Sequence, residues 1–228
     1  MMGKIKEIES KGLSGILLVF ALAIIFSCQT SAHSGSSIST EGKIEAIQNP
    51  LPVPFKCQGP PGDMGKSKNC GQTSALMVMC YHKQRTPSVE NIMEIDDWLF
   101  RKYRDPINNY NGSGTDTRKL EALVKEYGGF PLSYKENGWG LVDLRNHIAK
   151  GLPVIAAVKA RHLSNRGYKY AWEHFVVVIG YTTDSIICHD PARPNGAQKH
   201  YDNEEFSKAF SSLGGDVVVV VPNGNESR

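Results

Sequence analysis

The sequence lacks an apolar run long enough to cross a membrane as a helix. Its longest uninterrupted apolar stretch, ILLVFALAIIF, covers residues 16–26, whereas a helix that spans a bilayer needs about 20 apolar residues. That length suits the hydrophobic region of an export signal, and the preceding segment MMGKIKEIESKG is polar and contains several lysines. We therefore expect residues 1–32 to be a signal peptide rather than an uncleaved anchor.

The signal can be processed in two ways. Residues 25–28, Ile-Phe-Ser-Cys, resemble a bacterial lipobox, in which case Cys28 carries lipid. Ordinary cleavage after Ala32 is the alternative. Residues 33–50 are rich in Ser, Gly and Thr and are expected to form a flexible linker. The sequence thus predicts export to the bacterial cell envelope or secretion, with membrane contact only through a lipid on Cys28.

A strong charge of either sign is also missing. The 26 Lys and Arg residues nearly balance the 23 Asp and Glu residues, which gives a formal charge of +3. No basic stripe alternates with aromatic residues, so nucleic acid is not an expected partner. The 228 residues suffice for one domain, which we place at residues 51–222, with 223–228 as a C-terminal tail.

Cysteine is sparse, and its spacing is irregular. The five cysteines form no CxxC pair, which argues against a disulfide scaffold and a structural zinc site. Export would allow disulfides, so the states of Cys57, Cys80 and Cys188 stay open, although we expect Cys80 and Cys188 to pack in the core. A zinc site from Cys188, His189, Asp190 and His174 is disfavoured because neighbouring strand residues face opposite ways. No cofactor or metal is expected.

Helices dominate the first half of the predicted domain. Residues 73–82, TSALMVMCYH, are apolar almost all round and predict a buried central helix. Helical periodicity, caps and terminal glycines predict three more helices, at residues 89–103, about 118–127 and 141–150.

β-Rich runs separated by turns fill the second half. They cover residues 153–160, 174–182, 185–191 and 216–222, with a short helix at 203–211. Thr183 and Asp184 are expected to form a hairpin turn. Helices followed by an antiparallel sheet predict an α+β fold with segregated lobes.

Three residues from distant segments are candidates for catalysis. Cys70 lies just before the central helix, where free N–H groups and partial positive charge favour a thiolate. His174 opens the most apolar strand. The predicted hairpin brings Asp190 within a residue or two of His174, so its carboxylate could orient the imidazole. Gln58 could add an amide donor to the Cys70 N–H in an oxyanion hole.

Four segments together resemble the successive motifs of C39-like cysteine peptidases, a papain-like group. They are VPFKCQ, NCGQTSALMVMCYH, KGLPVIAAVK and HFVVVIGY…DSIICHDP, and the resemblance covers residues 51–222. It implies a papain-like fold with Cys70 as nucleophile, His174 as base, Asp190 as the third member and Gln58 in the oxyanion hole. The sequence departs from the family at Gln72, where proline usually follows Cys-Gly. Gln58 also lies further from Cys70 than in the exporter peptidase domains, and we expect a stand-alone peptidase domain rather than part of a transporter.

The expected activity is hydrolysis of a peptide or amide bond through an acyl-enzyme, with a peptide or protein as substrate. Two alternatives stay open. A transglutaminase-like acyl transferase would pass the acyl group to an amine, and a binding module would keep the fold and bind a peptide without cutting it.

Overall fold

The computed structural model describes residues 49–59, 67–104, 115–163 and 173–222. Four sequence predictions therefore lie outside the described residues: the signal peptide, Cys28, most of the linker and the C-terminal tail. Within the described parts, no helix has the length and apolar character that a membrane crossing requires.

The helices on the N-terminal side are α1 (Cys70–His82), α2 (Val89–Tyr103) and α3 (Thr117–Ala122), and a π-helical turn, η1 (Leu123–Tyr127), extends α3. Ser88 caps α2 and forms a capping box with Asn91, and the bounds of this helix are those predicted. Helix α1 begins three residues earlier than predicted, because the Asn69 carbonyl already accepts a 2.9 Å bond from the Thr73 N–H. Cys70 is therefore the first residue of α1 and does not precede it.

Six strands form one antiparallel sheet in the order β1-β6-β2-β3-β4-β5. Their bounds are β1 (Tyr134–Glu136), β2 (Val154–Lys159), β3 (Glu173–Tyr181), β4 (Ser185–His189), β5 (Lys199–Asp202) and β6 (Val217–Val219). The remaining helices are α4 (Leu141–Ile148), the short η2 (Ala160–His162) and α5 (Asn203–Ser211). The edge strands β1 and β5 were not predicted from the sequence.

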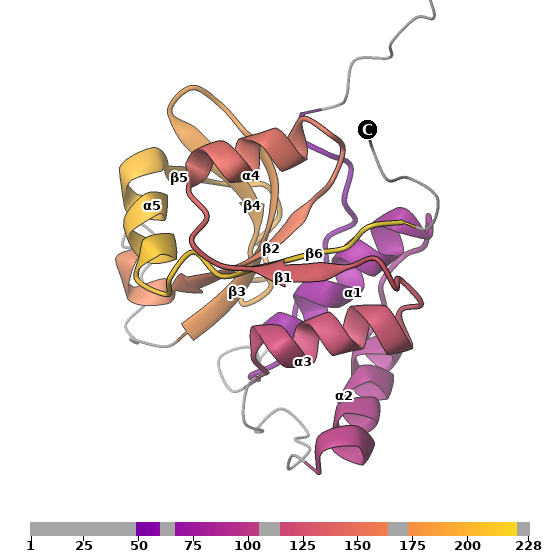
Figure 1. Ribbon diagram of the computed structural model, residues 1–228. Helices are drawn as coiled ribbons and strands as arrows, with labels where there is room; N and C mark the ends of the chain where they lie inside the picture. The colour runs from indigo at the N-terminus through magenta and orange to yellow at the C-terminus, as the bar shows by residue number, and fades with distance from the viewer. Residues whose placement is uncertain (1–48, 60–66, 105–114, 164–172, 223–228) are drawn as a thin grey trace, which may run out of the picture. The chain divides into compact units, whose positions relative to one another are not determined.

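The α+β fold is confirmed, but the segregation of helices and strands is only partial. In the chain β1 precedes α4, and α5 lies between β5 and β6. Figure 1 shows α1 and α3 below the sheet and α4 and α5 above it, and α1 and α4 both contact β2 and β3. With both faces covered, every residue from Val154 to Val158 is buried.

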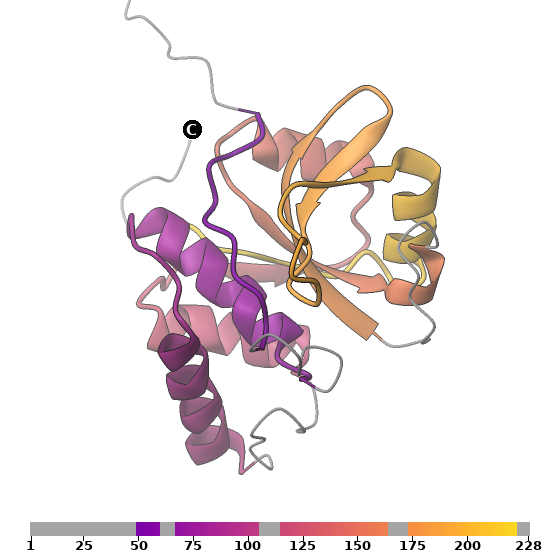
Figure 2. The same cartoon turned by 180° about the vertical axis from the view of Figure 1, so that it is seen from behind.

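Helix α1 is enclosed on all sides. Each residue from Gly71 to Cys80 is buried, which fits the nearly uniform apolar character of this segment. Figure 2 shows residues 49–59 running alongside α1, and the Lys56 N–H contacts the Met77 sulfur at 3.1 Å. This segment also bonds to the sheet, because the Leu51 N–H donates to the Ile179 carbonyl at 2.7 Å.

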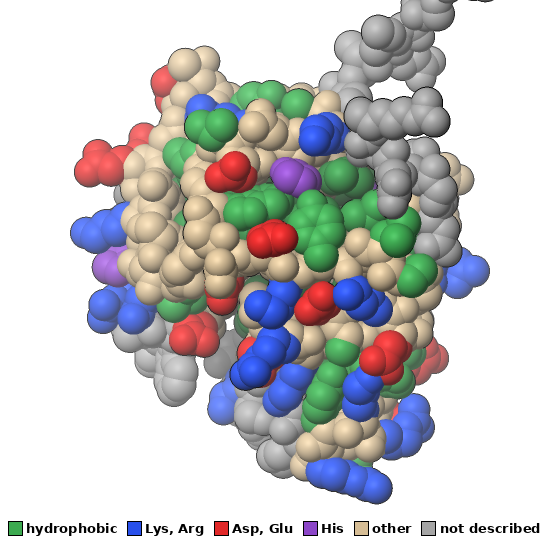
Figure 3. Space-filling model, in the orientation of Figure 1, with side chains coloured by type: hydrophobic (Ala, Val, Ile, Leu, Met, Phe, Trp, Pro, Cys, Tyr) green, Lys and Arg blue, Asp and Glu red, His purple; other side chains and the backbone are tan. Residues whose placement is uncertain are grey.

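Charged side chains of both signs lie on the surface over α2 and α3, whereas hydrophobic side chains gather nearer the sheet and α4 (Figure 3). Leu132 and Val142 are exposed large hydrophobic residues, at 44% and 67% of their surface. The mixture of signs agrees with the small net charge.

Candidate active site

The hairpin of β3 and β4 brings His174 and Asp190 together. The Thr182 N–H donates to the Ser185 carbonyl across the turn at 2.8 Å, and Val177 pairs with His189, in the register expected from the sequence. Asp190 follows the last residue of β4, and its Oδ1 lies 2.9 Å from His174 Nε2. The exposed fractions are 6% for His174 and 0% for Asp190.

Cys70 lies on the other side of the imidazole. Its side chain is hydrogen-bonded to His174 and also accepts from the backbone N–H groups of Gly71 and Phe175. Because Nε2 of His174 faces Asp190, Nδ1 is the ring nitrogen left for Cys70. The three side chains therefore form one hydrogen-bonded series from the first residue of α1, through β3, to the end of β4.

The electrostatics favour a charged Cys70–His174 pair. Burial alone would raise the pKa of the Cys70 thiol, but the hydrogen bond and charge of His174 outweigh it, so this pKa is lowered. Burial would lower the pKa of His174, yet the charge and hydrogen bond of Asp190, together with Cys70, raise it to about 10. A thiolate facing an imidazolium is the reactive form of such a pair.

The glycine after Cys70 allows α1 to approach the sheet closely. A methyl group at position 71 would overlap the Thr115 methyl group and press on the Phe175 ring. One turn along the helix, the Ser74 hydroxyl donates to the Phe175 carbonyl at 3.4 Å. Close packing of α1 on β3 at this point holds Cys70 within reach of His174.

Further donors surround the Asp190 carboxylate. Oδ1 accepts from the Ala192 N–H at 3.1 Å, and Oδ2 accepts from the Tyr201 hydroxyl at 2.9 Å. Arg193 Nε lies 3.7 Å from Oδ2. Burial of a carboxylate is costly unless hydrogen bonds and charges compensate for it, and these partners do so. Sequence reasoning missed Tyr201 because β5 has four residues and no strong strand pattern.

Gln58 is hydrogen-bonded both to the turn after Asp190 and to the residues that precede α1. Its backbone N–H donates to the Pro191 carbonyl at 2.9 Å, and its side-chain Nε2 donates to the Ser67 carbonyl at 2.7 Å. The side chain is 4% exposed. The amide thus lies between the Asp190 turn and the residues that lead into α1, and its role in an oxyanion hole stays a prediction.

The described cysteines form no disulfide with one another. Cys57, Cys70, Cys80 and Cys188 are all free thiols, and Cys80 and Cys188 are buried, as predicted. Cys57 donates to the Arg193 carbonyl at 2.8 Å. His189 turns away from the site and contacts the Val53 carbonyl at 2.8 Å. In the described ranges, no three His, Cys, Asp or Glu side chains are placed to hold a metal ion.

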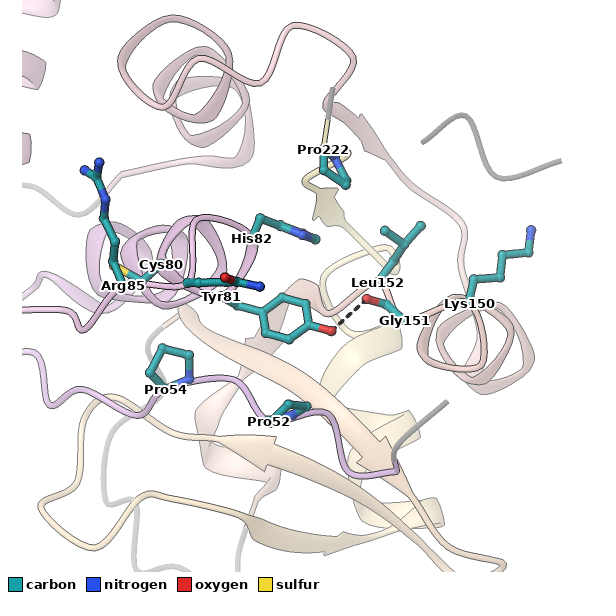
Figure 4. Close-up of a pocket in the computed structure, with 11 residues that line it drawn as sticks. Pro52, Pro54, Cys80, Tyr81, His82, Arg85, Lys150, Gly151, Leu152 and Pro222 are labelled. Carbon is teal, nitrogen blue, oxygen red and sulfur yellow. Dashed lines mark hydrogen bonds between the residues drawn. The ribbon is translucent and has the colours of Figure 1, made fainter. Parts of the chain in front are cut away.

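A cavity of about 610 Å³ lies at the opposite end of α1 (Figure 4). Its lining includes Pro52, Tyr81, His82 and Leu152, and the Tyr81 hydroxyl donates to the Gly151 carbonyl at 3.3 Å. The helix rises about 18 Å between its two ends. This cavity therefore contains none of the predicted catalytic residues.

Comparisons with known proteins identify the family and support the fold. The model of the Peptidase_C39 like family matches residues 50–218. A comparison with curated proteins found no match. Among solved structures, a protein from Bacillus anthracis described as a C39-like peptidase is 20% identical with a TM-score of 0.57, covering 77% of this chain and 98% of its own.

Two further solved structures are similar to this chain at 17% identity. One is a double glycine motif protease from an AMS/PCAT transporter in complex with the leader peptide, with a TM-score of 0.49 and coverage of 78% of this chain and 97% of its own. The other is the peptidase domain of Streptococcus ComA, a bi-functional ABC transporter, with a TM-score of 0.45 and coverage of 68% of this chain and 93% of its own. The family match spans most of the sequence, and the chain belongs to the Peptidase_C39 like family.

Proposed function

We propose that this chain is an exported cysteine peptidase that cleaves a peptide or amide bond through an acyl-enzyme on Cys70. The observation that carries the proposal is the hydrogen-bonded series Cys70–His174–Asp190, with the nucleophile at a helix N-terminus. Family membership supports the same activity.

In the first half of the reaction, the Cys70 thiolate attacks the carbonyl carbon and a C–S bond forms. The oxygen becomes an oxyanion, which the Cys70 N–H and the Gln58 amide would stabilise. When the C–N bond breaks, the His174 imidazolium gives its proton to the leaving amine. Asp190 holds the ring in position throughout.

In the second half, water attacks the thioester carbonyl while neutral His174 takes a proton from it. The C–S bond then breaks, the acid product leaves, and the thiolate and imidazolium are restored. Every step uses groups of the chain and water.

Export and anchoring are part of the same proposal. The apolar segment at residues 16–26 would direct export, and Cys28 would carry the lipid that holds the enzyme at the membrane. Labelling of cells with a palmitate analogue would show incorporation that the Cys28→Ser variant loses. Incorporation that persists in that variant would place the lipid elsewhere.

A proteome-derived peptide library tests the activity. The wild-type protein should cleave a subset of peptides, and each product should carry a new carboxyl terminus. Repeating the digestion with an added primary amine separates hydrolysis from acyl transfer, because a transferase would attach the amine to the new end. If peptides bind but no product forms in either condition, the chain is a binding module and the proposal is wrong.

Tyr201→Phe should lower kcat about tenfold while the protein stays folded. The substitution removes only the hydroxyl that donates to Asp190 Oδ2, and a hydrogen bond to a charged group contributes about 1.5–3 kcal/mol. Tyr134→Phe is the matched control, because it removes a 3.0 Å hydroxyl–His147 contact on β1. Equal kcat values for the two variants would show that Tyr201 has no part in positioning Asp190.

A further inference from the structure

A partly buried polar cluster brackets the proposed nucleophile. Asn69 Nδ2 donates to Asp96 Oδ2 at 2.9 Å, and Gln72 Nε2 donates to Asp96 Oδ1 at 3.1 Å. The same Gln72 nitrogen lies 3.4 Å from Asn69 Oδ1. The two amides come from the residues one before and two after Cys70, so one carboxylate holds both sides of the first turn of α1.

The position of Asp96 on α2 is unusual for a charged residue. Ile92, Ile95 and Leu99 form the buried stripe of this helix. Asp96 is half-buried on the same face, four residues after Ile92 and three before Leu99. A carboxylate at such a position is unfavourable unless polar groups compensate for its burial. The groups that do so here, Asn69 and Gln72, are 2% and 5% exposed.

Asn69 does not cap the helix in the usual way. Asn at an N-cap normally accepts from a backbone N–H of the first turn, but here the side chain makes no capping bond and contacts Asp96 instead. Its backbone is held by the Ser67 hydroxyl, which accepts from the Asn69 N–H at 3.2 Å. The side chain of Asn69 therefore does not compete for the N–H groups beside Cys70.

We propose that Asp96 is a positioning residue for Cys70, which fixes the first turn of α1 through Asn69 and Gln72. This inference rests on the proposed function, since it assigns a role in orienting the same nucleophile toward His174. The hydrogen bonds that link Asp96 to Asn69 and Gln72, rather than the negative charge of Asp96, hold the turn in place. Burial raises the pKa of Asp96 to about 6, although the hydrogen bonds from Gln72 and Asn69 oppose this shift, which agrees with a carboxylate partly withdrawn from water.

The substitution Asp96→Asn removes the negative charge but can keep the hydrogen bonds to Asn69 and Gln72. The oxygen of the introduced amide could still accept from Asn69. Its nitrogen could donate to Gln72 after the Gln72 amide turns over, because the buried Gln72 Oε1 has no hydrogen-bond partner among the described residues. The hydrogen bonds would then persist without a negative charge. The substitution Asp96→Ala removes both the hydrogen bonds and the charge.

The experiment measures the rate of Cys70 alkylation by iodoacetamide across pH, followed by mass spectrometry of the Cys70 peptide. Asp96→Ala should slow alkylation near pH 6 about tenfold and raise the apparent pKa of Cys70, because a displaced turn weakens the contact with His174. Asp96→Asn should stay within about twofold of the wild type. Circular dichroism confirms that each variant is folded.

Asp97→Ala is the matched control, since Asp97 is the next residue of α2 and forms an exposed ion pair with Arg101. If Asp96→Ala does not fold, Gln72→Met keeps the buried volume, removes one donor and should raise the apparent pKa of Cys70 by a smaller amount. A folded Asp96→Ala variant with a wild-type alkylation profile would overturn the proposal, as would an equal loss in Asp96→Asn. Neither result would touch the proposed function, which is tested separately by peptide cleavage with the wild-type protein and by the reactivity of wild-type Cys70.

Discussion

Cys70→Ala should abolish peptide cleavage, by on the order of 10⁴-fold or more, because no acyl-enzyme can form without the thiolate. The structure indicates that the fold will survive this change. Cys70 is only partly buried and occupies the first residue of α1, and alanine is a good helix former. The measurement is product formation from the most readily cleaved library peptides, by mass spectrometry.

The matched control is Cys80→Ala, ten residues further along the same helix. Cys80 is 7% exposed and packs in the core, so its replacement should cost about 1 kcal/mol of stability and leave cleavage unchanged. Cleavage by the Cys70→Ala protein at more than a few per cent of the wild-type rate would contradict covalent catalysis at Cys70.

His174→Ala should lower kcat about 10²–10⁴-fold, the range in which positioned acids and bases act. Two functions are lost together, since His174 both stabilises the thiolate and supplies the proton for the leaving amine. Substrate binding should change little, so KM should remain close to the wild-type value. The measurement is steady-state kinetics with a single peptide taken from the library.

His147→Ala provides the comparison for this variant. His147 is held by the Tyr134 hydroxyl and packs against Trp139, with ring centroids 4.4 Å apart, but it lies on α4 and its hydrogen bonds go to Tyr134 and Asp143. Its kcat should match the wild type. If both histidine variants lose activity equally, the loss reflects stability and not chemistry.

The proximity of His174 and Asp190 could be predicted because local rules fix it. The turn at Thr183 and Asp184 sets the register of β3 against β4, and that register brings Asp190 to His174. The bounds of α2 and α5 were also predictable, because Ser88 and Asp202 are N-caps that accept from backbone N–H groups.

The start of α1 could not be predicted in the same way. Asn69, Cys70 and Gly71 have weak helix propensity, and the helix extends through them because tertiary packing encloses the turn. The π-helical turn after Ala122 has no sequence signal either. Short edge strands such as β1, with three residues, are too brief for an alternating pattern to be recognised.

The residues that support the site were the least predictable part. Asp96 and Tyr201 reach Asn69, Gln72 and Asp190 only through the tertiary fold. In the sequence, Asp96 is one of several acidic residues on an amphipathic helix. Contacts between distant segments depend on how α1, α2 and the sheet pack, and a pattern within one segment does not contain that information.

The central claim is that His174 activates Cys70, and the pH dependence of Cys70 alkylation by iodoacetamide tests it most directly. In the wild type the thiolate paired with imidazolium should react at pH values below the ordinary thiol pKa of about 8.5, and reactivity should fall as acid protonates it. In His174→Ala the apparent pKa should rise to about 8.5 or above, because burial then acts without the charge that opposed it. An apparent pKa near 8.5 in the wild type, unchanged by the substitution, would contradict the account.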